Sequence, residues 1–137
     1  MTSPEQIRAA LLADAELAVL VAARIHCGSL PAEATLPAIV VSAAGLGEGP
    51  VSRDSRGGWE RPRISCHCWA AQSDGVSAYG RAWQLAEAVK AALCASSLGA
   101  RIISHVDLPE PEADLHRVVV DAACWTLIET REEEPGS

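Results

Sequence analysis

Residues 116–129 read HRVVVDAACWTLIE, and this stretch decides the fold. Its apolar side chains alternate between two faces, as those of a β-strand do. One face carries Val118, Val120, Ala122, Cys124, Thr126 and Ile128. The other face is almost as apolar, although Asp121 interrupts it. A strand that is apolar on both faces needs two covers, so we expect a helix on one side and a second cover, such as a partner subunit, on the other.

The rest of the chain predicts two helices and three more strands. Apolar residues recur at three- and four-residue steps through residues 76–93, which is the period of a long helix. Ser3-Pro4-Glu5 begins an N-terminal helix, because it combines a capping hydroxyl with a proline and a carboxylate in the first turn. Asp14-Ala15-Glu16 breaks or redirects the chain before residues 17–21, where we expect only a short second turn.

Strands are expected at residues 36–42, 61–71 and 101–106, and the residues around Ile25 are compatible with a brief further strand. Between them, residues 45–58 predict a Gly-rich mobile loop or hairpin, and residues 107–114 predict a turn rich in proline and acids. The expected fold class is α+β. It consists of an antiparallel or mixed four-stranded sheet, a long helix packed across one face, and the N-terminal helix.

The 137 residues fit one domain, since single cores commonly reach this size. We expect the domain to span residues 1–130. Residues 131–137 read REEEPGS and predict a disordered acidic tail.

Charge and cysteine content exclude several classes of protein. A net charge of −7 argues against a nucleic-acid clamp, which needs a continuous basic face. No apolar run is long enough to span a bilayer. Five cysteines without an export signal indicate a reducing cytosol, where thiols act as small buried hydrophobic groups.

The most plausible chemical cluster is Cys66-His67-Cys68, because thiolates and imidazoles bind zinc. On a strand, however, the two cysteines point to one face and His67 to the other, so the three cannot converge on a metal. Residues 45–49 read GLGEG but lack the lysine of a phosphate-binding loop. We therefore expect no catalytic residue, no cofactor and no metal site.

Arginine and tryptophan residues are the expected contacts with other proteins. The arginines form the only basic concentration, in or next to the Gly-rich loop, where they can contact a neighbouring subunit or DNA phosphates. Indole rings anchor interfaces, and Trp69 lies on the polar face of its strand. The candidate interface residues are Arg53, Arg56, Trp59, Arg61, Arg63, Trp69 and Trp125.

The order of these elements resembles the tail-terminator or tail-completion proteins (also called tail-connector or neck proteins) of long-tailed phages and gene transfer agents. The matching segments are residues 10–13 (ALLA), 20–21 (LV), 24–25 (RI), 36–40 (LPAIV), 66–71 (CHCWAA), 86–93 (AEAVKAAL), 117–121 (RVVVD) and 125–126 (WT). They span nearly the whole chain, and none is a catalytic signature.

The resemblance implies a structural subunit of a ring, expected to be a hexamer, that ends the tail tube and joins it to the head. Its partners would be copies of itself, the tail-tube protein and a head-closure or neck protein, with no membrane. DNA would pass through the lumen without specific binding. Assembly would occur in the bacterial cytoplasm, and the finished particle would hold the protein at its neck.

Two alternatives remain. A head-closure or other neck adaptor protein shares the small size and the ring geometry. From another class, a small metal- or thiol-dependent enzyme would use Cys66, Cys68 and a histidine.

Overall fold

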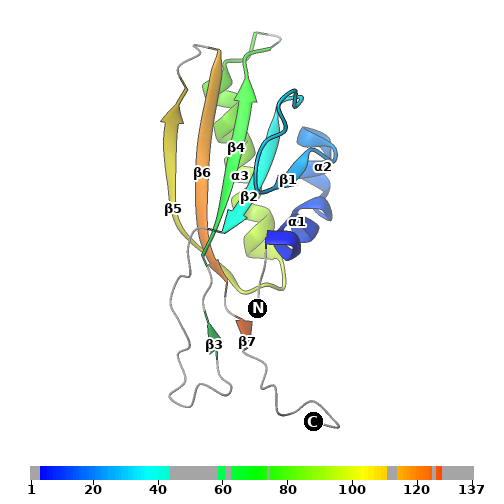
Figure 1. Ribbon diagram of the computed structural model, residues 1–137, viewed down its shortest axis with the longest axis vertical. Coiled ribbons are helices and arrows are strands. Elements are labelled where there is room, and N and C mark those ends of the chain that lie inside the picture. Colours follow the sequence, from blue (N-terminus) through cyan, green and yellow to red (C-terminus); the bar gives the residue numbers. More distant parts are fainter. Residues whose placement is uncertain are drawn as a thin grey trace.

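The computed structural model describes residues 4–43, 59–60, 63–73, 75–110, 114–124 and 126–127; the loop predicted at 45–58 and the acidic tail at 131–137 lie outside these ranges. In chain order the elements are α1 (Pro4–Leu12), α2 (Ala15–Val21), β1 (Ile25–Cys27), β2 (Ala38–Ala43), β3 (Trp59–Glu60), β4 (Arg63–Ala71), α3 (Ala78–Ala95), β5 (Ala100–Pro109), β6 (Leu115–Cys124) and β7 (Thr126–Leu127) (Figure 1).

The three helices begin where the sequence offers a cap. Helix α1 starts at Pro4, as predicted. The backbone N–H of Leu17 donates to the Asp14 carboxylate at 3.1 Å, so Asp14 ends the first helix and caps the second. Ser77 caps α3 in the same way, accepting a hydrogen bond from the N–H of Gly80 at 3.0 Å. The long helix therefore starts two residues later than its apolar period indicated.

The main sheet has the strand order β1-β2-β4-β6-β5. Strands β1 and β2 are parallel and the other neighbours are antiparallel, which confirms the α+β class and the mixed sheet. Five strands stand where four were expected, because the three residues of β1 pair with β2 at the sheet edge. Strand β5 also runs on to Pro109 through the first part of the predicted turn, since Asp107 is paired opposite Val118.

All three helices cover the same face of the sheet, which we call the inner face (Figure 1). Helix α3 packs on β4 and β6, while α1 packs on β1 and β2. The core between them is aliphatic, and it includes Ile7, Leu11, Leu17, Ile39, Val41, Ile64, Leu85, Val89, Leu93, Val118 and Val120. No helix covers the opposite face within the described part of the chain, and we call that side the open face.

The last predicted strand is described in two pieces. Strand β6 ends at Cys124 in the main sheet, and β7 pairs with β3 in a separate two-stranded sheet. In the β4–β6 pairing Arg63 lies opposite Ala123. In the β3–β7 pairing Glu60, three residues before Arg63, lies opposite Thr126, three residues after Ala123. Both pairings therefore share one register and extend the strand direction beyond the main sheet (Figure 1). Trp125, Ile128 and Glu129 lie outside the described residues.

None of the helices in the described ranges is both long and apolar enough to cross a bilayer.

Candidate interface on the open face of the sheet

The open face combines polar and aromatic side chains of β4 and β6, which lie side by side, with the buried apolar Val119 and Ala123. Inner-face residues of β4 such as Cys66 and Cys68 are fully buried, whereas His67 and Trp69, which alternate with them, are partly exposed on the other side. The register places His67 opposite Val119 and Trp69 opposite Arg117. Of the alternation predicted for residues 61–71, the described part, Arg63–Ala71, is thus confirmed, and it aligns β4 and β6 side chains across the open face.

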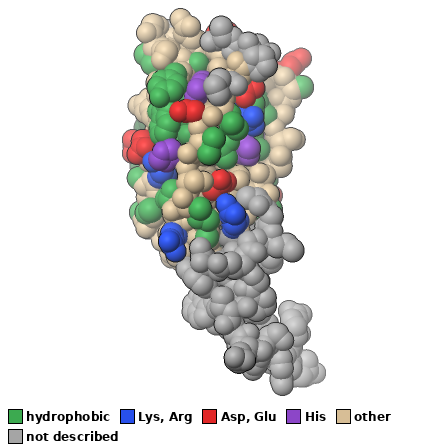
Figure 2. Space-filling view, turned by 90° about the vertical axis from the view of Figure 1, so that its left-hand side faces the viewer, with side chains coloured by type: hydrophobic (Ala, Val, Ile, Leu, Met, Phe, Trp, Pro, Cys, Tyr) green, Lys and Arg blue, Asp and Glu red, His purple; other side chains and the backbone are tan. Residues whose placement is uncertain are grey.

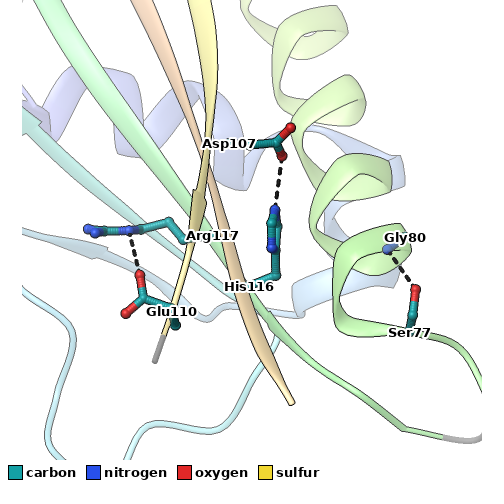
Figure 3. Close-up of polar contacts among 6 residues, drawn as sticks. All are labelled: Ser77, Gly80, Asp107, Glu110, His116 and Arg117. Atoms are coloured by element: carbon teal, nitrogen blue, oxygen red, sulfur yellow. Dashed lines mark hydrogen bonds and ion pairs between the residues drawn. The ribbon is translucent and has the colours of Figure 1, made fainter. Parts of the chain in front are cut away.

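Arg117 is the centre of one cluster on this face. Its guanidinium lies over the Trp69 ring, 4.6 Å from the ring centre, and its Nη1 donates to His67 Nδ1 at 3.2 Å. Arg117 Nε lies 3.3 Å from a Glu110 carboxylate oxygen, an ion pair whose geometry does not make a hydrogen bond (Figure 3). One arginine therefore joins three strand regions, and its charge is balanced within the chain.

The pKa of His67 depends on its burial and on Arg117. Burial lowers its pKa, and the positive charge of Arg117 lowers it further, against a smaller opposing effect of Asp121. A neutral imidazole can accept the hydrogen bond from Arg117, whereas an imidazolium cannot. The hydrogen bond from Arg117 to His67 Nδ1 therefore requires a neutral His67 imidazole.

A second cluster surrounds Asp121, further along β6. Its carboxylate accepts hydrogen bonds from the hydroxyl groups of Ser65 on β4 and Ser104 on β5, the latter at 3.2 Å. The carboxylate thus connects β6 to both neighbouring strands. This satisfies the one acid that interrupts the apolar pattern of the last strand.

A shallow hollow of about 140 Å³ opens beside the first cluster, lined by Gly28, Ser29, Leu30, Val40, His67, Trp69 and Arg117. Pockets for organic ligands are usually several hundred Å³. The hollow is smaller than such a pocket.

On the inner side, the contacts run between β5, β6 and α3. His116 Nε2 lies 2.9 Å from an Asp107 carboxylate oxygen, and Figure 3 shows His116 and Arg117 on opposite sides of β6. The His116 ring packs edge-on against Tyr79, and Trp83 packs edge-on against His105, with 5.0 Å between ring centres in each pair. These rings form a strip along α3 beside β5, and we call it the aromatic strip.

The cysteines of the predicted chemical cluster lie in the core. Burial raises the pKa of the Cys66 thiol to about 12 and that of Cys68 well above its ordinary value, so both remain protonated and poorly nucleophilic. His67 points to the other face, as the strand period required. No group of three or more His, Cys, Asp or Glu residues suited to a metal occurs among the residues described.

Of the candidate interface residues, Arg63 and Trp69 are placed with their side chains on the open face. Arg63 has a buried Nε without a hydrogen-bond partner in the described structure. Trp59 is described only as backbone in β3, while Arg53, Arg56, Arg61 and Trp125 lie outside the described residues.

Sequence reasoning missed Arg117 and Glu110 as members of the open-face cluster. The period of the last strand places Arg117 on the face of Val119 and Asp121, and that signal could have identified it. The strand register, which brings Arg117 to Trp69, has no local signal in the sequence.

The β5 side of the molecule carries no large patch of one charge among the described residues. Figure 2 shows acidic, basic and histidine side chains there, mixed among hydrophobic ones. Such a surface differs from the continuous basic face of a nucleic-acid clamp.

The comparisons with known proteins agree with the chain-long resemblance. No curated protein matches the sequence. A solved chain from the "Virion of native gene transfer agent (GTA) particle" has the same fold, with a TM-score of 0.59 and 15% sequence identity, covering 89% of this chain and 92% of that chain. The model of the family "Tail completion protein gp17" matches residues 5–127. The chain therefore belongs to the tail completion protein gp17 family, a family of structural proteins of phage tails.

Proposed function

We propose that this protein is a subunit of a ring, expected to be a hexamer, that ends the tail tube of a siphophage or phage-like gene transfer particle and joins it to the head. The observation that carries this proposal is the family match over residues 5–127, which includes every helix and every strand of the main sheet except the first residue of α1. The partners would be copies of the chain, the tail-tube protein and a head-closure or neck protein.

The open face supports an assembly role over catalysis. It has a partly exposed tryptophan, a stacked arginine and a hollow too small for most substrates. Aromatic and arginine side chains are enriched at protein contacts. Trp69 and Arg63 are accordingly proposed contacts, together with Arg53, Arg56, Trp59, Arg61 and Trp125.

The charge balance supports passage of DNA without binding. The whole chain carries −7, and Arg117 is already opposed by Glu110. A lumen wall of this kind would repel phosphates or leave them without unpaired cations to hold. DNA would then move through the ring without specific contacts.

The protein would assemble in the bacterial cytoplasm and end at the particle neck. We infer no catalytic activity, because the thiols of Cys66 and Cys68 are buried and protonated. A place in the head-closure ring remains the second candidate, since that position needs the same small ring subunit.

Removal of the gene from a producing cell distinguishes a ring at the end of the tail tube from a ring that closes the head. Loss of a tube terminator should leave tubes of uncontrolled length beside filled, tailless heads, and the intact gene supplied in trans should restore tails of one length. Loss of a head-closure protein would instead leave tails of normal length and heads that lose their DNA. The second result would contradict termination.

A further inference from the structure

The two edges of the main sheet are unequal. Strand β1 closes one edge with only three residues, and the Arg8 Nε donates to the Ile25 carbonyl at 2.6 Å, so this edge is short and partly capped. Strand β5 closes the other edge with ten residues. Its outer edge has no strand partner in the described chain. Natural proteins usually protect or cover such long edges, and a helix is one possible cover.

The β5 side also exposes apolar and aromatic groups. Ile103 is 40% exposed and Val106 is 46% exposed. A register shift between Ile102 and Ser104 leaves Ile103 out of the pairing with β6. Val106 lies on the open face opposite Val119, whereas the aromatic strip contacts the same strand on the inner face through His105. Trp83 of this strip has a buried indole N–H without an acceptor in the described structure. Arg101 on the same strand is exposed and has no ion-pair partner among the described residues.

Helix α2 presents the complementary surface. Val19 is 84% exposed, the highest exposure recorded for a large apolar side chain in the described structure. Glu16 lies three residues earlier, on the same helical face, and is exposed without an ion-pair partner in the described ranges. An apolar group beside an unpaired acid on α2 thus matches apolar groups beside an unpaired arginine on β5.

The two surfaces lie on opposite sides of the molecule. In Figure 1, β5 forms one side of the sheet and α2 lies at the other. A ring of identical subunits requires two different patches on each copy, so that every patch meets its complement on a neighbour. A contact between β5 and α2 of the same copy is excluded by their separation across the sheet.

We propose that the β5 edge of one copy docks against the exposed face of α2 on the next copy, with Ile103 and Arg101 meeting Val19 and Glu16. This inference rests on the proposed ring and names the surfaces that form it. Apolar contact would supply most of the affinity, while the opposite charges would select the head-to-tail orientation.

Charge exchange tests the proposal in a producing cell that lacks the gene. Glu16→Lys alone places lysine against Arg101 at every interface, and Arg101→Glu alone places glutamate against Glu16. Each variant should reduce finished particles by more than about tenfold, because like charges are repeated around the ring. Both side chains are exposed, so the thermal unfolding midpoint of each purified variant should stay close to that of the original chain.

Co-expression of the two variants gives the decisive result. In an alternating ring, each interface joins either the two substituted side chains, a lysine and a glutamate, or the two original ones, Glu16 and Arg101. Every interface then holds opposite charges, so particle yield should recover. The chain that carries both substitutions should recover as well. Glu33→Lys is the matched control, because Glu33 is exposed and lies outside α2, and it should leave the yield unchanged.

Normal yield from either single variant would overturn the proposed contact, and so would two defective variants that fail to rescue each other. Neither result would affect the proposed function. That function fails separately if the intact gene does not restore tail length.

Discussion

The two faces of the sheet are formed by the same strands but differ in composition and burial. On the inner face, Val118 and Val120 are fully buried beneath α3. On the open face, their neighbours Arg117 and Asp121 hold polar clusters that remain partly exposed. The contrast teaches that stability lies mainly in the aliphatic layer, whereas the open face maintains a defined surface. Four changes test this division, from the largest expected effect to the smallest.

Leu85→Ala should cause the largest loss of stability. The side chain is 1% exposed between α3 and the sheet, and its removal leaves a cavity in the aliphatic layer. The free energy of unfolding should fall by about 3 kcal/mol, measured by urea denaturation. Val106→Ala is the control, since Val106 is half exposed on the edge strand, and it should change the same quantity by less than about 0.5 kcal/mol. If the two substitutions lowered the free energy of unfolding equally, the inference that stability lies mainly in the aliphatic layer would be wrong.

Asp121→Ala should have the next largest effect. It leaves the hydroxyl groups of Ser65 and Ser104 without their shared acceptor, and the free energy of unfolding should fall by about 1–2 kcal/mol. Ser104→Ala removes one of these hydrogen bonds and should cost less than the aspartate substitution. If Asp121→Ala is as costly as Leu85→Ala, the open face contributes more stability than we infer.

Arg117→Lys should have a smaller effect on stability than Asp121→Ala. We expect it to lower the free energy of unfolding by up to about 1 kcal/mol. Lysine keeps the charge near Glu110 but loses the planar stack on Trp69. Tryptophan fluorescence should report a changed environment for Trp69, with Trp69→Phe identifying its share of the signal. An unchanged spectrum and stability would contradict the stacked arrangement.

The smallest effect concerns the proton equilibrium of His67. Its pKa in the folded chain lies below the ordinary value of 6.5, so the folded chain binds fewer protons than the unfolded chain between those two values. The free energy of unfolding should therefore rise with pH through that window and fall as the pH decreases.

Arg117→Ala should raise the pKa of His67, because it removes a neighbouring positive charge while burial remains. NMR titration of the imidazole would measure the shift, and His67→Gln would identify its signal. A lower pKa in the Arg117→Ala chain would contradict the inferred electrostatic contact.

The sequence predicted most of the elements because their signals are local. Pro4 and Asp14 mark helix boundaries, and the two-residue period of residues 61–71 separates Cys66 and Cys68 from His67 and Trp69. The fifth strand was harder to predict, since Ile25–Cys27 is too short to show a period and forms only because β2 lies beside it. The full length of β5 was missed for a similar reason. Asp107 is of a residue type common in turns, and its place in the strand depends on its contact with His116, which no local pattern indicates.

The candidate interface was predictable only in part. Trp69 stands out on a polar strand face, but its contact with Arg117 depends on a register between residues far apart in the sequence, which local patterns do not encode. The match between the β5 edge and α2 likewise depends on which strands end the sheet. Such relations come from the tertiary arrangement.

An image of the assembled particle at side-chain detail tests the central claim most directly. The account predicts a closed ring of this chain at the head-proximal end of the tail tube, with α2 of each copy against β5 of the next. Placement of the chain in the baseplate or the capsid shell would contradict it.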